Sequence, residues 1–341
     1  MAFDNLRLEK GMYGQTGKSF TQVLEQLDPS QNYRGTALEK TDAFQRQLKR
    51  FDIKVKGAHS DTVEKFFSSA DSAVLFPEFV ARTIRQGLEE TNQLADMVAA
   101  VTEINSMDYR SIYSVPEEED LNLETVAEGA SIPATTVRLK NHLVKLYKTG
   151  RMLVASYEAI RFQRLDLFSV MLRQIGAHIG QQQMEMAVNT LMNGDGNDNS
   201  APIYMPGDAV LGGSEGTFTY EHLLRFWNLF HPYELNTMVV SGSMLMKLLA
   251  IEEFRNPLTG MNFQGTGAMI TPMGAKIIRS SAVNHSQIVG FDKRYALEMV
   301  KAQDITVEYD KLIDRQLERA AITSIVGFTK IQTNATKCLY A

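Results

Sequence analysis

The sequence predicts an α+β protein of 341 residues in which one long helix joins separate lobes. Residues 156–194 contain no proline and are rich in good helix formers, which predicts a single helix. At 1.5 Å per residue this helix would span roughly 55 Å, more than one small domain can cover. Two further observations complete the fold class. Runs of β-branched and aromatic residues on both sides of the helix predict strands, and residues 218–300 alternate helical with strand patterns.

Both ends of the predicted helix carry end signals. Ser156 can cap the first turn, Glu158 places an anion there, and Gly194 suits the left-handed residue that follows many helices. Gly176 and Gly180 would let another backbone approach closely, mark a hinge where the helix bends, or simply be tolerated. The apolar residues that recur on one face are Leu165, Phe168, Leu172, Ile175, Ile179 and Met186.

The first 76 residues have the pattern of an arm. Short helical patterns at 20–27 and 37–51 alternate with polar breaks, and neither is long enough to form its own core. We expect this segment to pack on a neighbouring subunit or on the body of its own chain. The first helix of the body should begin near Pro77, a residue suited to a first helical turn.

An extended hairpin is predicted next. Strand-like residues at 97–104 and 108–115 precede an acidic run, and residues 132–156 form a long return. In the return segment Val137 and Leu139 alternate with Arg138 and Lys140, as in a strand with one partly exposed face. Because a two-stranded ribbon is only marginally stable alone, we expect it to rest on another surface, such as a neighbouring subunit.

Charge divides the chain into a basic beginning and an acidic remainder. The net charge is −5; residues 1–60 hold ten Lys and Arg against seven Asp and Glu, a net of +3, so residues 61–341 carry −8. An acidic body argues against a protein whose main task is to grip phosphates, although the basic segment could touch nucleic acid. A solvated helix face is the favoured interpretation of the basic cluster Lys40, Arg46, Lys49, Arg50, Lys54 and Lys56.

Signals for membrane insertion, secretion and disulfide formation are missing from the sequence. No apolar run approaches the eighteen or so residues of a membrane span, and the first residues lack the layout of a secretion signal. Cys338 is the single cysteine, which permits no internal disulfide. We therefore expect a reducing cytoplasm as the place of synthesis.

Catalytic and metal-binding patterns are also missing. The six histidines show no metal-ligand spacing, and the sequence has neither a nucleophile elbow nor a complete phosphate loop. Asp195, Asn197 and Asn199 have the spacing of a calcium loop, but Ser200 and Pro206 stand where that loop needs glycine and glutamate. We expect no cofactor, no metal and no enzyme activity, and favour a structural role.

Taken in this order, the parts of the chain resemble the major capsid proteins of tailed phages, of the Hong Kong 97 type. Residues 124–136 are similar to the family's Glu-Gly-Ala-x-Ile-Pro signature in the extended E-loop, and 143–160 to the strand that returns into the spine helix. Residues 191–196 resemble the end of that helix, 236–249 the axial domain and 291–339 the last strands of the peripheral domain. By this resemblance the residues of the E-loop that contact a neighbouring subunit are Glu128, Gly129, Ala130, Ile132 and Pro133.

The resemblance implies a division into six segments, covering most closely residues 77–341. These are an N-arm (1–76), a first part of the peripheral domain (77–107), an E-loop with its return strand (108–155), a spine helix within the peripheral domain (156–196), an axial domain (197–290) and closing peripheral strands (291–341).

It also implies a function. Pentamers and hexamers of the chain would close into an icosahedral virion capsid around a double-stranded DNA genome, assembled in the host cytoplasm. Because the chain starts at Met1 with a short N-terminal region, we expect no removed propeptide and a separate scaffolding protein. A portal and a decoration protein are further candidate partners, and packaged DNA would make weak, nonspecific contact. No motif supports a cross-link from Lys140, Lys145 or Lys148 to Asn334.

Two alternatives remain open. The first is an encapsulin-like shell of the same fold that encloses protein cargo. The second is an unrelated α/β enzyme.

Overall fold

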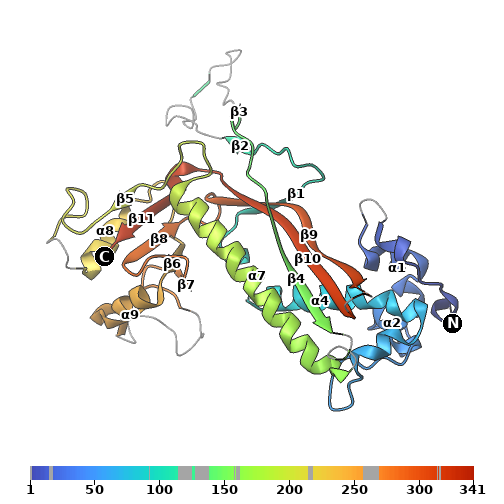
Figure 1. Ribbon diagram of the computed structural model, residues 1–341. Coiled ribbons are helices and arrows are strands. Elements are labelled where there is room, and N and C mark those ends of the chain that lie inside the picture. Colours follow the sequence, from blue (N-terminus) through green and yellow to red (C-terminus); the bar gives the residue numbers. More distant parts are fainter. Residues whose placement is uncertain are drawn as a thin grey trace. The chain divides into compact units, whose positions relative to one another are not determined.

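The computed structural model describes residues 2–14, 18–91, 93–113, 125–126, 138–156, 158, 162–213, 218–255, 269–312, 314 and 316–341. Within these ranges helices and strands are mixed, which confirms the predicted α+β class (Figure 1). The chain divides into two compact units. Unit 1 comprises Met1–Thr91, Thr149–Gly180 and Asp304–Ser324, and unit 2 comprises Asn92–Lys148, Gln181–Gln303 and Ile325–Ala341.

Short helices occupy the first part of unit 1. Helix α1 (Phe20–Leu27) lies where the sequence predicts it, because Ser19 and Gln22 form a reciprocal capping box. Helix α2 (Ala43–Arg50) begins at a second capping box, between Asp42 and Gln45, and so occupies only the second half of its predicted range. The other short helices are η1 (Ala2–Asn5), η2 (Lys10–Gly14), η3 (Ser30–Tyr33), η4 (Val63–Ser68) and α3 (Ala70–Ala73).

The core of unit 1 joins this N-terminal region to two longer helices. Helix α4 (Leu75–Thr91) begins close to Pro77, as predicted, and α7 (Leu165–Asn193) contributes its first half. Of the two surfaces that the sequence offers for the first 76 residues, the structure shows packing on their own chain. The buried side chains of this core include Phe20, Leu24, Phe44, Phe66, Phe76, Ile84, Leu165 and Leu172.

The predicted start of the long helix at Ser156 is wrong. Ser156 is the last residue of strand β4 (Tyr147–Ser156), and α7 begins at Leu165. The carbonyl oxygen of Gln163 accepts from the Val63 N–H at 2.9 Å, and the Leu165 N–H donates to the Asp61 carbonyl at 2.9 Å. Because these backbone groups are engaged by the 61–63 segment, the helix starts only after them. The far end agrees with the prediction, since Gly194 follows Asn193 at a φ of 81°.

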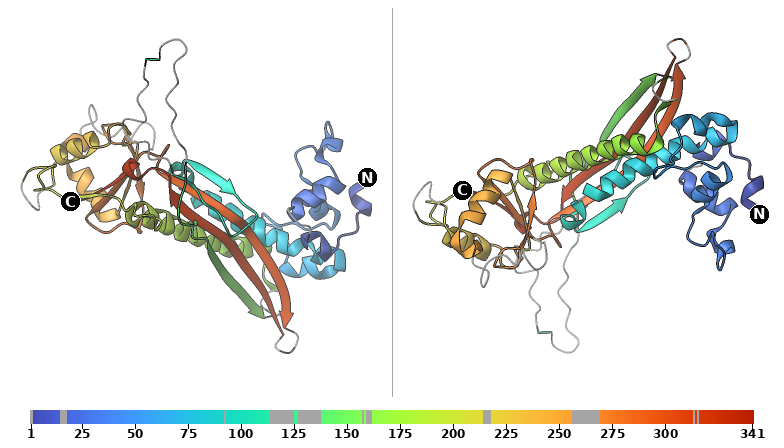
Figure 2. Two further views of the ribbon diagram at one scale, coloured as in Figure 1. Left: turned by 90° about the horizontal axis from the view of Figure 1, so that it is seen from above. Right: turned by 90° about the horizontal axis from the view of Figure 1, so that it is seen from below.

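A four-stranded sheet has the strand order β1-β9-β10-β4. Strand β1 (Ala100–Glu103) pairs in parallel with β9 (Leu297–Leu312), which lies beside β10 (Leu317–Lys330) (Figure 2). Strand β9 is continuous over its whole range. Strands β1 and β4 are the two edges of this sheet.

A five-stranded sheet in unit 2 has the order β5-β11-β8-β6-β7. Its strands are β5 (Ile203–Tyr204), β6 (Thr237–Val240), β7 (Lys276–Arg279), β8 (Gln287–Phe291) and β11 (Thr336–Tyr340). Apolar side chains of these strands form a core with α8 (Tyr220–Asn228), α9 (Gly242–Ala250) and α10 (Glu252–Arg255). Two 3-10 helices, η5 (Leu94–Asp96) and η7 (Thr333–Ala335), complete the unit.

The last strand of the chain joins the five-stranded sheet. The sequence groups residues 291–341 as closing peripheral strands, but β11 pairs antiparallel with β8, with Cys338 opposite Val289. Both strands are buried along nearly their whole length, so each needs a partner on both sides. The last strand therefore belongs to the sheet that holds residues 197–290.

Candidate assembly surfaces

The five predicted E-loop contact residues, Glu128, Gly129, Ala130, Ile132 and Pro133, lie outside the described residues. The base of the predicted hairpin is described. Strand β2 (Ile112–Tyr113) pairs antiparallel with β3 (Arg138–Leu139), with Ile112 opposite Leu139. The Lys140 N–H donates to the Ser111 carbonyl at 3.0 Å, and the Val144 N–H to the Tyr109 carbonyl at 2.9 Å. We call residues 108–113 and 138–144 the ribbon base.

In the return segment Lys140 lies on the buried side and Leu139 on the exposed side. Lys140 is only 2% exposed, whereas Leu139 is 64% exposed and Ile112 is 51% exposed. Lys140 is buried because its ammonium group finds three partners: Asp195 at 2.6 Å, the Thr329 hydroxyl at 2.8 Å and the carbonyl of Lys330. The apolar side chains of the ribbon base are left at the surface.

Asp195 is the ion-pair partner of Lys140. Its carboxylate also accepts hydrogen bonds from the Thr329 hydroxyl and the Asn197 amide. Burial alone would raise the pKa of Asp195, but the hydrogen bonds from Lys140, Thr329 and Asn197 outweigh burial and hold it well below its usual value. This residue of the calcium-like pattern thus neutralises a buried cation. Among the described residues no group of three His, Cys, Asp or Glu is placed to hold a metal ion.

A second buried charge holds the other strand of the ribbon base. Glu298 of β9 is 6% exposed, and its carboxylate accepts hydrogen bonds from the hydroxyls of Tyr109 and Ser111, the former at 2.7 Å. The Thr102 hydroxyl of β1 donates to the same carboxylate. Neither Glu298 nor Thr329 was predicted from the sequence as a functional residue. The signal for Glu298 was a lone carboxylate within the otherwise apolar run 296–300, since a charge in a buried strand needs polar partners.

The two glycines of the predicted hinge differ in their surroundings. A Cβ atom on Gly176 would lie 2.0 Å from the Ile84 carbonyl oxygen of α4, so the two helix backbones touch there, as the close-approach interpretation predicts. Figure 2 shows α4 and α7 side by side. At Gly180 the nearest atom would be the Thr91 hydroxyl at 3.3 Å. A hinge at these residues stays a prediction.

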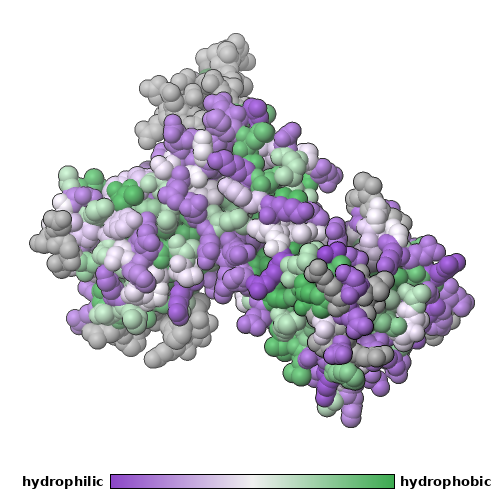
Figure 3. Space-filling view, viewed as in Figure 1, coloured by the Kyte–Doolittle hydropathy of each residue, from purple (hydrophilic) through white to green (hydrophobic). Residues whose placement is uncertain are grey.

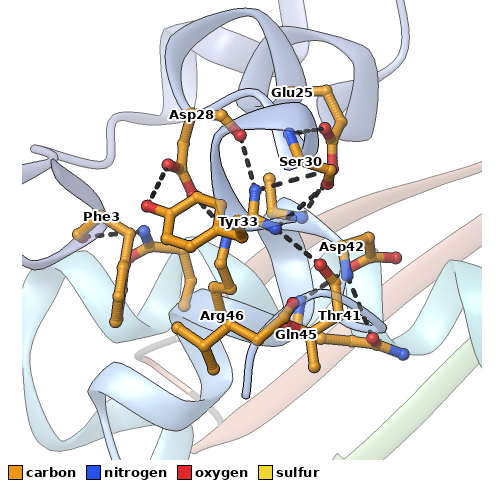
Figure 4. Close-up of polar contacts among 12 residues, drawn as sticks. Phe3, Glu25, Asp28, Ser30, Tyr33, Thr41, Asp42, Gln45 and Arg46 are labelled. Atoms are coloured by element: carbon orange, nitrogen blue, oxygen red, sulfur yellow. Dashed lines mark hydrogen bonds and ion pairs between the residues drawn. The ribbon is translucent and has the colours of Figure 1, made fainter. Parts of the chain in front are cut away.

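The predicted basic cluster does not lie on one face. Arg46 is fully buried in unit 1, which contradicts a solvated position for it. Its guanidinium lies 2.6 Å from the Asp28 carboxylate and 4.3 Å from the centre of the Tyr33 ring, and the Tyr33 hydroxyl donates to Asp28 (Figure 4). Arg50 is half-buried and donates to the Leu6 carbonyl. The members left exposed are Lys40, Lys49, Lys54 and Lys56.

Apolar side chains also remain exposed on unit 1. Leu167, Val170 and Met171 have exposed fractions of 59%, 54% and 43%, and their spacing places them on one face of α7. Figure 3 shows hydrophobic residues gathered over the first turns of this helix. Met152 and Val154 are exposed on the edge strand β4. A soluble monomer rarely leaves such patches uncovered, which indicates surfaces that bind other chains.

No helix in the described part of the chain is long and apolar enough to cross a membrane. The buried charges of Arg46, Lys140 and Glu298 have ion-pair or hydrogen-bond partners within the chain, whereas apolar side chains remain exposed on the ribbon base and on α7. Exposed apolar surfaces of this kind are typical of a subunit that packs against other chains.

The comparison with protein families also indicates a subunit of an assembly. The family described as phage capsid protein matches residues 141–338, more than half of the chain. The chain belongs to this family and is a major capsid protein, a structural subunit of the virion. A search of curated protein sequences found no match.

Solved structures show the same fold at low sequence identity. The capsid of an empty GTA particle has a TM-score of 0.54 at 13% identity, over 73% of this chain and 89% of that one. The virus-like particle from Pyrococcus furiosus has a TM-score of 0.50 at 12% identity, over 77% and 99%. The capsid of cyanophage P-SCSP1u has a TM-score of 0.50 at 13% identity, over 72% and 87%. The chain thus has the predicted Hong Kong 97-type capsid fold.

Proposed function

We propose that the chain assembles as pentamers and hexamers into an icosahedral shell that encloses a double-stranded DNA phage genome. Membership of the phage capsid protein family supports a shell subunit. The observation that carries the proposal is the set of apolar side chains exposed on the single chain, above all Ile112 and Leu139 of the ribbon base and Leu167 of α7. Covering them with neighbouring subunits removes apolar area from water and favours assembly.

The ribbon base supports a role for the E-loop between subunits. Ile112 of β2 and Leu139 of β3, the strands that precede and follow the predicted tip of the E-loop, have exposed apolar side chains. In our proposal Glu128, Gly129, Ala130, Ile132 and Pro133 contact the neighbouring subunit. Residues 197–290 form the axial domain, and Gly176 and Gly180 allow the spine helix to bend when the shell changes form.

The charge distribution supports weak contact with DNA. Residues 61–341 carry a net charge of −8, and only part of the basic cluster near the N-terminus is exposed. Such a surface repels DNA more than it binds it, so a packaged genome is held by the closed shell.

The remaining parts of the proposal concern role and partners. The chain acts as a structural subunit and not as a catalyst. It assembles in the host cytoplasm with a separate scaffolding protein and a portal, and a decoration protein joins the finished shell.

Electron microscopy of the full-length chain, alone and co-expressed with the neighbouring viral genes, tests the assembly. Absorbance at 260 and 280 nm of the same fraction reports its contents. We expect closed icosahedral shells or rings of five and six subunits, and nucleic acid in shells from infected cells. Shells that contain a protein cargo and no nucleic acid would favour the encapsulin-like alternative. Monomers under every condition would overturn both.

A pair of variants links assembly to the ribbon base. Leu139→Asp adds a charge to an exposed apolar side chain, so it should leave the fold intact but prevent closed shells. Gln182→Glu adds the same charge to an exposed polar position of α7 and should assemble normally. Normal shells from Leu139→Asp would exclude this surface as a contact.

A further inference from the structure

Two buried charged residues, Lys140 of the ribbon base and Glu298 of β9, form hydrogen bonds that hold the two strands of the ribbon base. Ser111 and Lys140 face each other, joined by the 3.0 Å hydrogen bond from the Lys140 N–H to the Ser111 carbonyl. The Ser111 side chain donates to Glu298 on β9. The Lys140 side chain donates to Asp195 and to Thr329 on β10. We call these five residues the ribbon clamp.

The clamp lies at the boundary between buried and exposed parts of the ribbon base. Ser111 and Lys140 are each 2% exposed, while their outer neighbours Ile112 and Leu139 are 51% and 64% exposed. Packing against the rest of the chain therefore holds Ser111 and Lys140 in place, but does not hold Ile112 and Leu139. Backbone pairing between two short strands would hold the exit direction only weakly, because an isolated ribbon is marginally stable.

Polar partners fix direction better than apolar contacts do. The Lys140 ammonium group uses its three donors on three acceptors, and the Glu298 carboxylate accepts from three hydroxyls that come from β1 and the ribbon base. A rotation of the ribbon base would leave a buried charge without its partners, which is far more costly than sliding one apolar surface over another. The backbone is tied to the same network, since the His142 N–H donates to Asn197 beside Asp195.

We infer that Glu298 and Lys140 are positioning residues that set the direction of the ribbon base, from which the predicted E-loop extends, and thereby which neighbouring surface the loop reaches. This inference rests on the proposed assembly of the chain. Beyond that proposal, the direction of the ribbon base is set by residues of the same chain and not by the neighbouring subunit.

Hydrogen exchange of the purified full-length chain tests the clamp without requiring assembly. The double variant Lys140→Met with Asp195→Leu removes both charges of this ion pair together, so neither partner is left buried without the other. We expect exchange at the Lys140 and Val144 amides to become at least tenfold faster. Amides of β8 and β11, which report on global unfolding, should keep their rates. Lys145→Met changes an exposed lysine of the same return segment and should alter neither.

Assembly provides the second measurement. Electron microscopy of the double variant should show irregular or incomplete particles where the unaltered chain forms regular ones. Glu298→Leu should behave like the double variant, while Glu298→Gln, which keeps an acceptor oxygen, should recover most regular particles.

Three outcomes would overturn the inference. They are unchanged exchange at the ribbon base, equally faster exchange in β8 and β11, and regular particles from a variant whose ribbon base exchanges faster. If the unaltered chain never assembles, the proposed function fails, while the exchange rates still decide whether the clamp fixes the ribbon base.

Discussion

Gly176 of α7 lies so close to Ile84 of α4 that a Cβ atom at Gly176 would be 2.0 Å from the Ile84 carbonyl oxygen. The contact is reciprocal, because a Cβ atom on Gly87 of α4 would be 2.2 Å from the carbonyl oxygen of Arg173 in α7. Each helix therefore needs a glycine where the two cross. Backbone atoms cannot move aside as the end of a side chain can, so even one methyl group forces the helices apart.

Gly176→Ala should therefore destabilise the protein, by about 1–3 kcal/mol or more, despite the better helix propensity of alanine. Gly180→Ala is the matched control in the same helix. Its nearest neighbour would be a side-chain oxygen at 3.3 Å, so we expect a change within about 1 kcal/mol of zero. Urea unfolding followed by circular dichroism measures both. Equal free energies of unfolding for the two variants would show that α4 and α7 can move apart without loss of stability.

Arg46→Met should destabilise unit 1 by about 3–5 kcal/mol, because Asp28 would remain buried without its cation. Lys49→Met, on an exposed position of the same helix, should change the free energy of unfolding by less than about 0.5 kcal/mol. Chemical denaturation of the two variants beside the unaltered chain provides the comparison. A loss below about 1 kcal/mol for Arg46→Met would mean that the pair contributes no more than a surface ion pair.

Lys330 should make the free energy of unfolding depend on pH in the alkaline range. Burial lowers the pKa of Lys330 to about 8, whereas an unfolded lysine titrates near pH 10.4. Between these values the unfolded chain binds more protons, so the contribution of Lys330 to stability rises with pH, by at most about 1.4 kcal/mol per unit. Burial raises the pKa of Cys338 to about 11, and this group acts in the opposite sense.

A comparison of Lys330→Met with the unaltered chain measures the contribution of the lysine, including its charge interaction with Cys338. The stability of the variant relative to the unaltered chain should be greatest near pH 7 and should fall between pH 8 and pH 10. Unfolding in urea at each pH gives the difference directly, with Lys148→Met as the exposed control. A difference that stays constant with pH would contradict the lowered pKa of Lys330.

Cys338 should be unreactive in the folded chain. Its side chain is 1% exposed, and its raised pKa keeps the thiol protonated at neutral pH, while alkylating reagents attack the thiolate. Labelling at pH 8 should be at least about a hundredfold slower than for the chain unfolded in urea. Rapid labelling of the native protein would place Cys338 at an accessible surface.

Much of the fold follows from local patterns in the sequence. Helix α1 was predicted over its full length from the helical pattern of residues 20–27, and its capping residues Ser19 and Gln22 are only three positions apart. The end of α7 at Asn193 was predicted because Gly194 marks it by itself. The fold class and the resemblance to phage capsid proteins rest on the order of such segments, and the family match confirms the resemblance.

The errors concern residues whose partners are distant in the chain. The alternation of the return segment did not show that Lys140 is buried, because its partner Asp195 is 55 residues away. Glu298 was not recognised, because Ser111 lies 187 residues before it. The start of α7 was placed at Ser156, since nothing near that residue shows that the 61–63 segment takes the backbone groups before Leu165.

The sequence by itself determined the class of the fold, the order of the segments and the family, because helix caps, periodicity and turn residues act over a few positions. The tertiary structure alone decided which charges are buried, where α7 begins and how the ribbon base is held. Those features depend on which distant groups meet, and a buried charge is tolerated only where its partner arrives.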